Sequence, residues 1–307
     1  MRTKKDAAVL NLLEWGQNLG EIGLYFLFYE PMGKDVESVK NISYGPLKRN
    51  RYDIYYKKEL NDKKKPLFIY FHGGGYISGT KEPRKFYCKK WLEEGYVAVN
   101  VNYHYKENYP FKDQLADSFK AVAHILSDAE KYNIDTENII ISGESAGAHI
   151  ASMVSQAYGN REIYENFAPD FPYKDSFRAK GCVLISGIYE TEKLLSYKFV
   201  NMKSFAMCLC DKGFDEVEAY LQTEEGRKLA VMYYLNDKFP PSVIIKSKYD
   251  LLAPDSDLLK EALDKLGVPN ELCLCDGVCG VHAGGLFTKF GAGKKCLDKS
   301  KKFIQKL

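Results

Sequence analysis

Short apolar runs alternate with longer amphipathic stretches along most of this chain. Runs such as Pro66–Phe71 (PLFIYF) and Asn138–Ser142 (NIIIS) suit strands buried on both faces of a parallel sheet. Lys112–Lys131 instead places its apolar residues at helical spacing. The predicted strands are Arg51–Lys57, Pro66–Phe71, Tyr96–Asn102, Asn138–Ser142, Cys182–Ser186, Val243–Lys246 and Glu271–Cys275, and the predicted helices are Phe86–Glu94, Lys112–Lys131, Ala146–Ala157, Ser256–Leu266 and Lys294–Leu307. This alternation predicts an α/β fold with a mostly parallel central sheet and helices on both faces.

Two regions do not follow this alternation. Residues 1–50 contain an amphipathic stretch and an aromatic run, and residues 189–238 form a helix-rich insert between two predicted strands. No internal repeat and no Pro-, Gly- or Ser-rich linker divides the chain. We therefore expect a single domain over residues 1–307, with a helical cap assembled from residues 1–50 and 189–238.

The charge balance excludes several classes of partner. Among 307 residues, 44 Lys and Arg stand against 41 Asp and Glu, so the formal net charge is +3. Such a surface predicts no nucleic-acid binding and no stable association with a membrane. The N-terminal residues lack the apolar core of a secretion signal, and no run approaches the roughly 20 apolar residues of a membrane span. We expect a cytoplasmic protein.

The eight cysteines form no Cys-x-x-Cys pair of the kind found in zinc ribbons and redox motifs. Cys273, Cys275 and Cys279 could be grouped with His282 as a metal site. Alternation along a strand explains Cys273 and Cys275 better, because free cysteine often packs as a small hydrophobic residue. We therefore expect neither a metal nor an organic cofactor.

The segment Gly143-Glu144-Ser145-Ala146-Gly147 lies between a predicted strand and a predicted helix. This is the context that a nucleophile elbow requires, since flanking glycines permit a tight turn that presents the serine hydroxyl above the sheet. The start of the helix also offers free backbone N–H groups. The pattern alone arises by chance too often to assign a function, so its context carries the argument.

A second motif, His72-Gly73-Gly74-Gly75-Tyr76, directly follows the predicted strand Pro66–Phe71. Three glycines after a strand let the backbone approach a ligand closely. In a hydrolase such a loop donates N–H groups to the oxyanion of the tetrahedral intermediate. The alternative is a plain glycine-rich turn. That alternative does not explain why two such motifs both follow predicted strands.

An acid and a base follow the serine in the order Ser, Asp, His. Asp250 comes after the predicted strand Val243–Lys246, and His282 comes after the last predicted strand in a glycine-rich loop. Two nearby acids, Asp255 and Asp257, compete with Asp250, but we expect them to cap the following helix. The other histidines, none of which combines a position after the acid with a strand-end loop, are His72, His104, His124 and His149.

The combination of HGGGY, GESAG, a Tyr-Asp-Leu-Leu acid motif and a late histidine resembles the hormone-sensitive-lipase-like branch of α/β-hydrolases. That branch contains carboxylesterases and acetyl esterases, and the likeness runs from about residue 51 to about residue 302. The resemblance implies the α/β-hydrolase fold with a helical cap. It also implies a catalytic triad and an oxyanion hole. The implied triad is Ser145, Asp250 and His282, and the implied oxyanion donors are the N–H groups of Gly74, Gly75 and Ala146.

These observations predict a serine carboxylesterase that cleaves small to medium acyl esters through an acyl-enzyme intermediate. Its partner would be a small-molecule ester. Two alternatives stay open. An amidase of the same fold, resembling kynurenine formamidase, shares an HGG loop and this triad order. A non-catalytic binding protein is the other alternative; the gibberellin receptors of this family are of that kind, but they lack the catalytic histidine, which is present here as His282.

Overall fold

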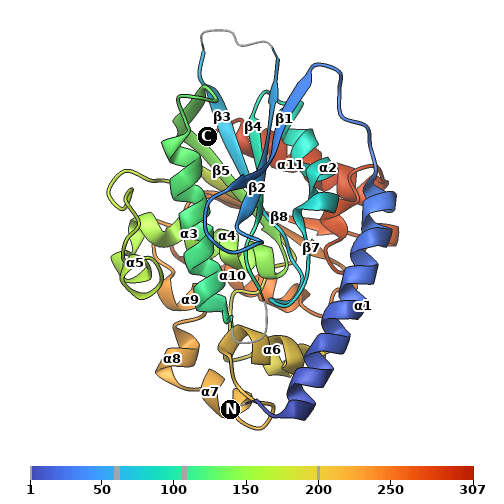
Figure 1. Ribbon diagram of the computed structural model, residues 1–307, viewed down its shortest axis with the longest axis vertical. Coiled ribbons are helices and arrows are strands. Elements are labelled where there is room, and N and C mark those ends of the chain that lie inside the picture. The colour runs from blue at the N-terminus through green and yellow to red at the C-terminus, as the bar shows by residue number, and fades with distance from the viewer. Residues whose placement is uncertain (1, 59–62, 106–108, 199–200) are drawn as a thin grey trace.

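Eight strands of the described chain form one continuous sheet in the computed structural model, which describes residues 2–58, 63–105, 109–198 and 201–307 (Figure 1). The strands are β1 (Val36–Ser43), β2 (Arg51–Lys57), β3 (Lys65–Phe71), β4 (Val97–Asn102), β5 (Ile134–Glu144), β6 (Gly181–Ile185), β7 (Ser242–Ser247) and β8 (Asn270–Cys275). Their order across the sheet is β1-β2-β4-β3-β5-β6-β7-β8. β1 and β2 run antiparallel to their neighbours, whereas β4, β3 and β5 through β8 are parallel to one another.

Helices pack on both faces of this sheet. The helices are α1 (Lys4–Phe28), α2 (Lys81–Leu92), α3 (Phe111–Ser127), α4 (Ala146–Gln156), α5 (Arg161–Phe167), α6 (Met202–Cys210), α7 (Val217–Leu221), α8 (Glu224–Arg227), α9 (Val231–Tyr234), α10 (Ala253–Lys265) and α11 (Gly291–Ile304). α2 and α11 share one buried apolar cluster with one face of the sheet, and α3, α4 and α10 share another with the opposite face. The predicted α/β architecture with a mostly parallel sheet is therefore confirmed.

The predicted strands and helices are present with small shifts at their ends. α2 begins five residues before its predicted start at Phe86, because the Thr80 side chain accepts a hydrogen bond from the Glu82 N–H and caps the helix. β1 was not predicted. Its residues are mostly exposed, and as an edge strand it lacks the apolar alternation that marks a half-buried strand. Part of the segment 1–50 therefore belongs to the sheet rather than to a cap.

α1 is the longest helix of the described chain, with 25 residues. A capping box between Thr3 and Asp6 begins it, and it packs against α2. Its apolar residues lie on more than one side: Leu10 and Phe28 are buried, whereas Trp15 is largely exposed. Within the described ranges, every helix falls short of the length or the apolarity that crossing a bilayer would require.

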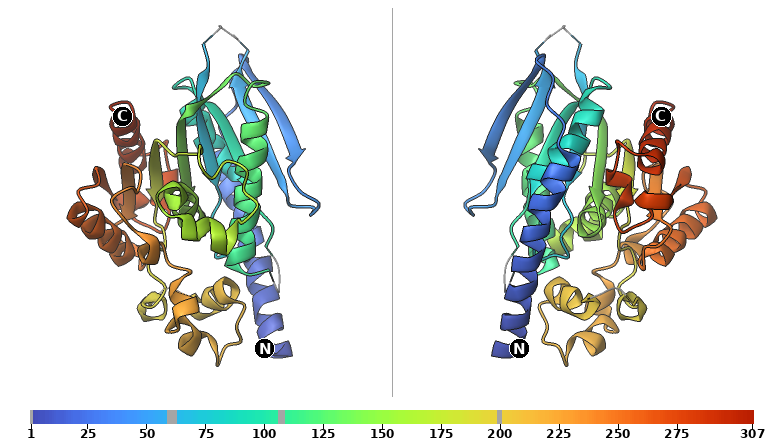
Figure 2. Two further views of the ribbon diagram at one scale, coloured as in Figure 1. Left: turned by 90° about the vertical axis from the view of Figure 1, so that its left-hand side faces the viewer. Right: turned by 90° about the vertical axis from the view of Figure 1, so that its right-hand side faces the viewer.

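The helices α6 to α9 gather beyond one end of the sheet, next to the N-terminal half of α1 (Figures 1 and 2). They come from the insert between β6 and β7. The parallel strands point their carboxyl ends toward this group of helices, so side chains that follow β3, β5, β7 and β8 meet there.

Candidate active site

Ser145 occupies a strained turn between β5 and α4. Its φ of 54° and ψ of −124° lie where L-residues are rare, and its N–H donates to the Ile185 carbonyl oxygen at 2.8 Å. The flanking glycines have no room for a side chain. A Cβ atom at Gly143 would lie 2.4 Å from the Gly147 carbonyl oxygen, and one at Gly147 would lie 2.2 Å from the Phe71 carbonyl oxygen. The spacing of the motif is thus required by the close approach of β3, β5 and α4.

The glycine loop after β3 lies directly beside this turn. Gly74 and Gly75 have φ values of +130° and +59°, which L-residues with a side chain rarely adopt. A Cβ atom at Gly74 would overlap the Ser78 carbonyl oxygen at 2.2 Å, and one at Gly75 would overlap the Phe205 ring at 2.5 Å. These contacts leave no room for a side chain at either glycine, so the loop is bare backbone at both positions.

His72 holds this loop in shape and is unsuited to act as a base. Its Nδ1 lies 2.7 Å from the Gly73 carbonyl oxygen, its Nε2 lies 3.4 Å from an Arg49 Nη atom, and its ring stacks on Tyr103. Because the guanidinium can only donate, the neutral ring carries its proton on Nδ1 and donates it to Gly73. Burial, together with the nearby Arg49 and Arg84 charges, holds the pKa of His72 well below 6.5.

Asp250 and His282 meet at the ends of β7 and β8. The His282 Nδ1 atom lies 2.8 Å from the Asp250 Oδ2 atom, and the Leu252 N–H donates to the other oxygen at 3.0 Å. Burial alone would raise the pKa of Asp250, but the hydrogen bonds from His282 and Leu252 outweigh it and leave the pKa below its ordinary 3.8. The carboxylate therefore stays ionised at neutral pH and orients the imidazole.

Four of the six predicted site residues line a single cavity of about 480 Å³: Ser145, His282, Gly74 and Gly75. Asp250 lies behind His282, and Ala146 is buried at the start of α4, behind Ser145. The rest of the wall is largely apolar, with side chains from α1, α6 and the loop that follows His282; they include Leu24, Phe28, Met202, Phe205, Leu286 and Phe287.

His149 and His124, two of the other histidines, have fixed roles elsewhere. His149 bridges α4 and the insert: Tyr76 donates its hydroxyl proton to Nδ1 at 2.8 Å, and Nε2 lies 2.7 Å from the Leu229 carbonyl oxygen. Burial lowers the pKa of His149 from 6.5 to about 3. His124 pairs with the Tyr52 hydroxyl at 3.0 Å.

The expectation that Asp255 and Asp257 cap the helix after Asp250 is wrong. Leu252 occupies the cap position of α10. The buried Asp255 carboxylate instead accepts hydrogen bonds from the start of the insert: the N–H groups of Tyr189 and Glu190 and the Tyr197 hydroxyl. Burial raises the pKa of Asp255 from 3.8 to about 7 despite these bonds. Asp257 is paired with Lys246 at 2.6 Å.

The cysteines near His282 pack as hydrophobic residues. Cys273 and Cys275 are buried on β8 and the intervening Leu274 is exposed, so the expected alternation is confirmed. All eight cysteines are buried, and the Cys275 and Cys296 sulfur atoms lie 3.3 Å apart. Within the described ranges, no three His, Cys, Asp or Glu side chains are grouped so as to hold a metal ion.

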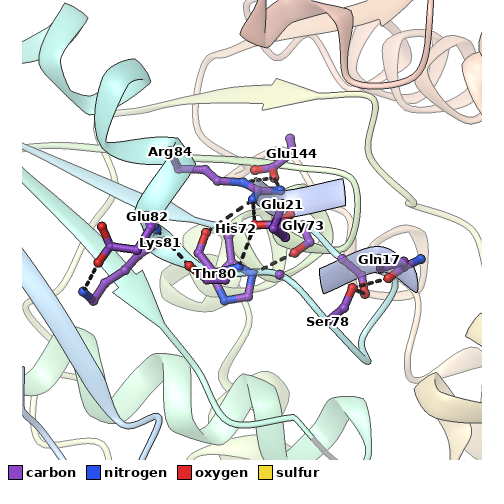
Figure 3. Close-up of polar contacts among 12 residues, drawn as sticks. Gln17, Glu21, His72, Gly73, Ser78, Thr80, Lys81, Glu82, Arg84 and Glu144 are labelled. Carbon is purple, nitrogen blue, oxygen red and sulfur yellow. Dashed lines mark hydrogen bonds and ion pairs between the residues drawn. The ribbon is translucent and has the colours of Figure 1, made fainter. Parts of the chain in front are cut away.

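The sequence analysis missed three charged residues that also line the cavity: Glu21 of α1, Arg84 of α2, and Glu144, which precedes Ser145 (Figure 3). Their side chains form one buried chain of ion pairs. Glu144 lies within the Gly-Glu-Ser-Ala-Gly motif, but the sequence analysis gave it no role. No spacing in the sequence links Glu21 to Arg84, so the pairing becomes visible only in the fold.

Comparisons with known proteins place this geometry in context. The sequence model of the BD-FAE family matches residues 52–263. The isoprenylcysteine alpha-carbonyl methylesterase ICME of Arabidopsis thaliana is 24% identical over 245 residues, which are 78% of this chain and 55% of that protein. Arylacetamide deacetylase-like 4 family member 1 of Mus musculus is 22% identical over 83% of this chain and 76% of that protein. The chain spans only about half the length of several curated relatives that it matches.

Solved structures of esterases share the fold. Esterase B from Lactobacillus rhamnosis superposes with a TM-score of 0.81 at 18% identity and covers 99% of this chain and 98% of its own. The carboxylesterase EstE1, cloned from a metagenomic library, superposes with a TM-score of 0.73 at 21% identity, over 97% of each chain. These superpositions confirm the predicted α/β-hydrolase fold.

Proposed function

Because the chain belongs to the BD-FAE family, we propose that it is a serine hydrolase of carboxylic esters with small to medium acyl groups. The observation that carries this proposal is the 2.8 Å contact between His282 and Asp250 at a cavity that Ser145 and the glycine loop also line. A base held by a buried carboxylate, a serine on a strained turn and a loop of backbone donors are the three parts that acyl transfer requires.

In the proposed mechanism His282 removes the Ser145 hydroxyl proton while Oγ attacks the ester carbonyl carbon. The N–H groups of Gly74, Gly75 and Ala146 stabilise the negative charge on the carbonyl oxygen. His282 then gives its proton to the leaving alcohol as the C–O bond breaks, which leaves an acyl group on Ser145. Water, deprotonated by the same imidazole, attacks this acyl group and releases the acid.

The cavity favours uncharged substrates of moderate size. Most of its wall is apolar, and the charged side chains in the wall, Glu21, Arg84 and Glu144, bind one another. A volume of about 480 Å³ lies within the range of pockets that enclose small organic ligands. We further propose that α1 and residues 189–238 form the cap over this cavity. Leu24 and Phe28 of α1 and Met202 and Phe205 of α6 support this assignment, because all four line the wall.

The test is hydrolysis of p-nitrophenyl acetate, butyrate, octanoate and palmitate by the purified protein and by Ser145→Ala. We expect activity that declines toward palmitate and is lost in the variant. Ser152→Ala is a matched control, since Ser152 lies on α4 and its hydroxyl bonds only the Ala148 carbonyl oxygen among the contacts described. Equal rates for the protein and Ser145→Ala would reject the esterase. N-formylkynurenine would then test the amidase alternative.

A further inference from the structure

Arg84 is buried between two carboxylates that come from distant parts of the chain. Its side chain is 4% exposed. Its Nε and one Nη atom each lie 2.7 Å from the Glu144 Oε1 atom, and the other Nη atom binds Glu21 of α1 (Figure 3). A buried guanidinium needs such partners, because water cannot reach its charge to stabilise it.

Glu144 adjoins both parts of the proposed reaction centre, the turn at Ser145 and the glycine loop after β3. It directly precedes Ser145, and the Tyr70 hydroxyl donates to its Oε2 atom at 2.7 Å. A Cβ atom at Gly73 would lie 2.7 Å from the Glu144 carbonyl oxygen and 3.1 Å from its Oε1 atom. A shift of Glu144 would therefore move Ser145 and the glycine loop relative to each other.

α1 holds the same region from the outside. Glu21 accepts a hydrogen bond from the Thr80 N–H at 3.2 Å, in addition to its ion pair with Arg84. One helical turn earlier, Gln17 contacts the Ser78 hydroxyl, which lies 2.9 Å from the Gly74 carbonyl oxygen. Two adjacent turns of α1 thus hold the segment that follows the glycine loop.

We propose that Glu21 is a positioning residue for the reaction. By fixing Arg84 it fixes the carboxylate of Glu144, and Glu144 sets the distance between the Ser145 hydroxyl and the N–H donors of Gly74 and Gly75. α1 then has a part in the chemical step as well as in covering the cavity. This inference rests on the proposed esterase function.

The test compares Glu21→Gln with Glu14→Gln. Both changes remove one negative charge from α1, but Glu14 lies two turns earlier and takes no part in the Arg84 ion pairs. With p-nitrophenyl butyrate we expect Glu21→Gln to lower kcat by about 10- to 100-fold, because displacements near 1 Å are that costly to a reacting geometry. KM should stay within about two-fold of wild type, and Glu14→Gln should match wild type in both constants.

A trifluoromethyl ketone with the same acyl group supplies a second readout, since it forms a tetrahedral adduct with the nucleophile. Its inhibition constant should rise in Glu21→Gln by the factor by which kcat/KM falls. If α1 only stabilised the fold, Glu21→Gln would lower thermal stability, but the inhibition constant would not rise by the factor by which kcat/KM falls. If Glu21→Gln does not fold, Glu21→Asp can replace it. This variant keeps the negative charge on a side chain that is shorter by one methylene, and it should lower kcat by less than the 10- to 100-fold expected for Glu21→Gln.

A change in KM alone would overturn the proposal and assign Glu21 to substrate binding. Equal losses in Glu21→Gln and Glu14→Gln would overturn it as well. A wild-type protein that hydrolyses no ester would reject the proposed function instead. In that case the rate at which a fluorophosphonate labels Ser145 still tests positioning, and equal labelling rates in wild type and Glu21→Gln would reject it.

Discussion

The cavity has two kinds of wall, and they are built by different physical means. On the side of the sheet, Gly74 and Gly75 present bare backbone and Ser145 lies on a strained turn at a strand end, and added Cβ atoms at the two glycines would overlap neighbouring atoms. On the side of the helices, the wall consists of apolar side chains such as Leu24 and Phe205. Atoms fixed by strand pairing suit steps that need exact distances, whereas packed side chains suit the choice of an acyl group. Substitutions of the apolar side chains on the side of the helices should therefore change the preference among acyl groups, whereas substitutions on the side of the sheet should change kcat.

The largest effect should come from Asp250 on the side of the sheet. In Asp250→Asn the amide can donate to His282 Nδ1, which leaves the proton on Nε2 and removes the base that Ser145 needs. We expect kcat with p-nitrophenyl butyrate to fall about 10⁴-fold with little change in KM. Asp257→Asn, a change of the same kind at an acid paired with Lys246, should retain wild-type activity. A comparable loss in both variants would contradict the assignment of the acid.

Phe205 gives the matching test on the side of the helices. Its ring packs against Gly75, so Phe205→Ala should lengthen the acyl space without removing an oxyanion donor. We expect the ratio of kcat/KM for octanoate to that for acetate to rise about ten-fold. Phe214→Ala is the control, because Phe214 lies in the same insert but is about half exposed. An unchanged ratio in Phe205→Ala would show that this ring does not limit the acyl group.

The smallest effect concerns the junction of the two sides, where Asp255 of α10 holds Tyr189, Glu190 and Tyr197 of the insert. Its pKa is about 7 in the fold against 3.8 ordinarily, so the folded protein binds a proton more tightly than the unfolded chain. The stability that this proton contributes is fully present below about pH 4 and is lost as the pH rises through 7.

Urea unfolding at pH 5 and pH 8 measures this contribution. The decrease in the free energy of unfolding between the two values should be smaller in Asp255→Asn than in wild type, because the amide does not titrate. Asp257→Asn, at a partly exposed acid of the same helix, should keep the wild-type slope. Equal slopes in all three proteins would mean that Asp255 does not hold its proton near neutral pH.

The side of the sheet was predictable because its signals are local. The strand before His72 and the strand and helix around Ser145 are marked by apolar runs and by glycines that the turns require. The confirmed order of elements then brings their ends to one edge. Asp250 could be chosen over Asp255 and Asp257 by its position after a strand, although the reason given for rejecting Asp255 was wrong.

The side of the helices was not predictable in this way. Glu21 and Arg84 are far apart in the chain, and a single acid on an amphipathic helix reads as an ordinary surface residue. The same holds for Phe205, whose contact with Gly75 depends on how the insert folds back over the sheet. Such contacts arise from tertiary packing, and neither periodicity nor turn chemistry encodes them.

Because Asp250 and His282 follow Ser145 and the glycine loop in the chain, the ribosome synthesises them later. A growing chain that has passed α4 already contains the serine and the glycine loop, but β7 and the edge strand β8 have not yet joined the sheet. Until they pair, Ser145 has neither Asp250 nor His282 beside it. Under the proposed mechanism the nascent chain is therefore inert toward esters, and activity begins only when β8 pairs with β7.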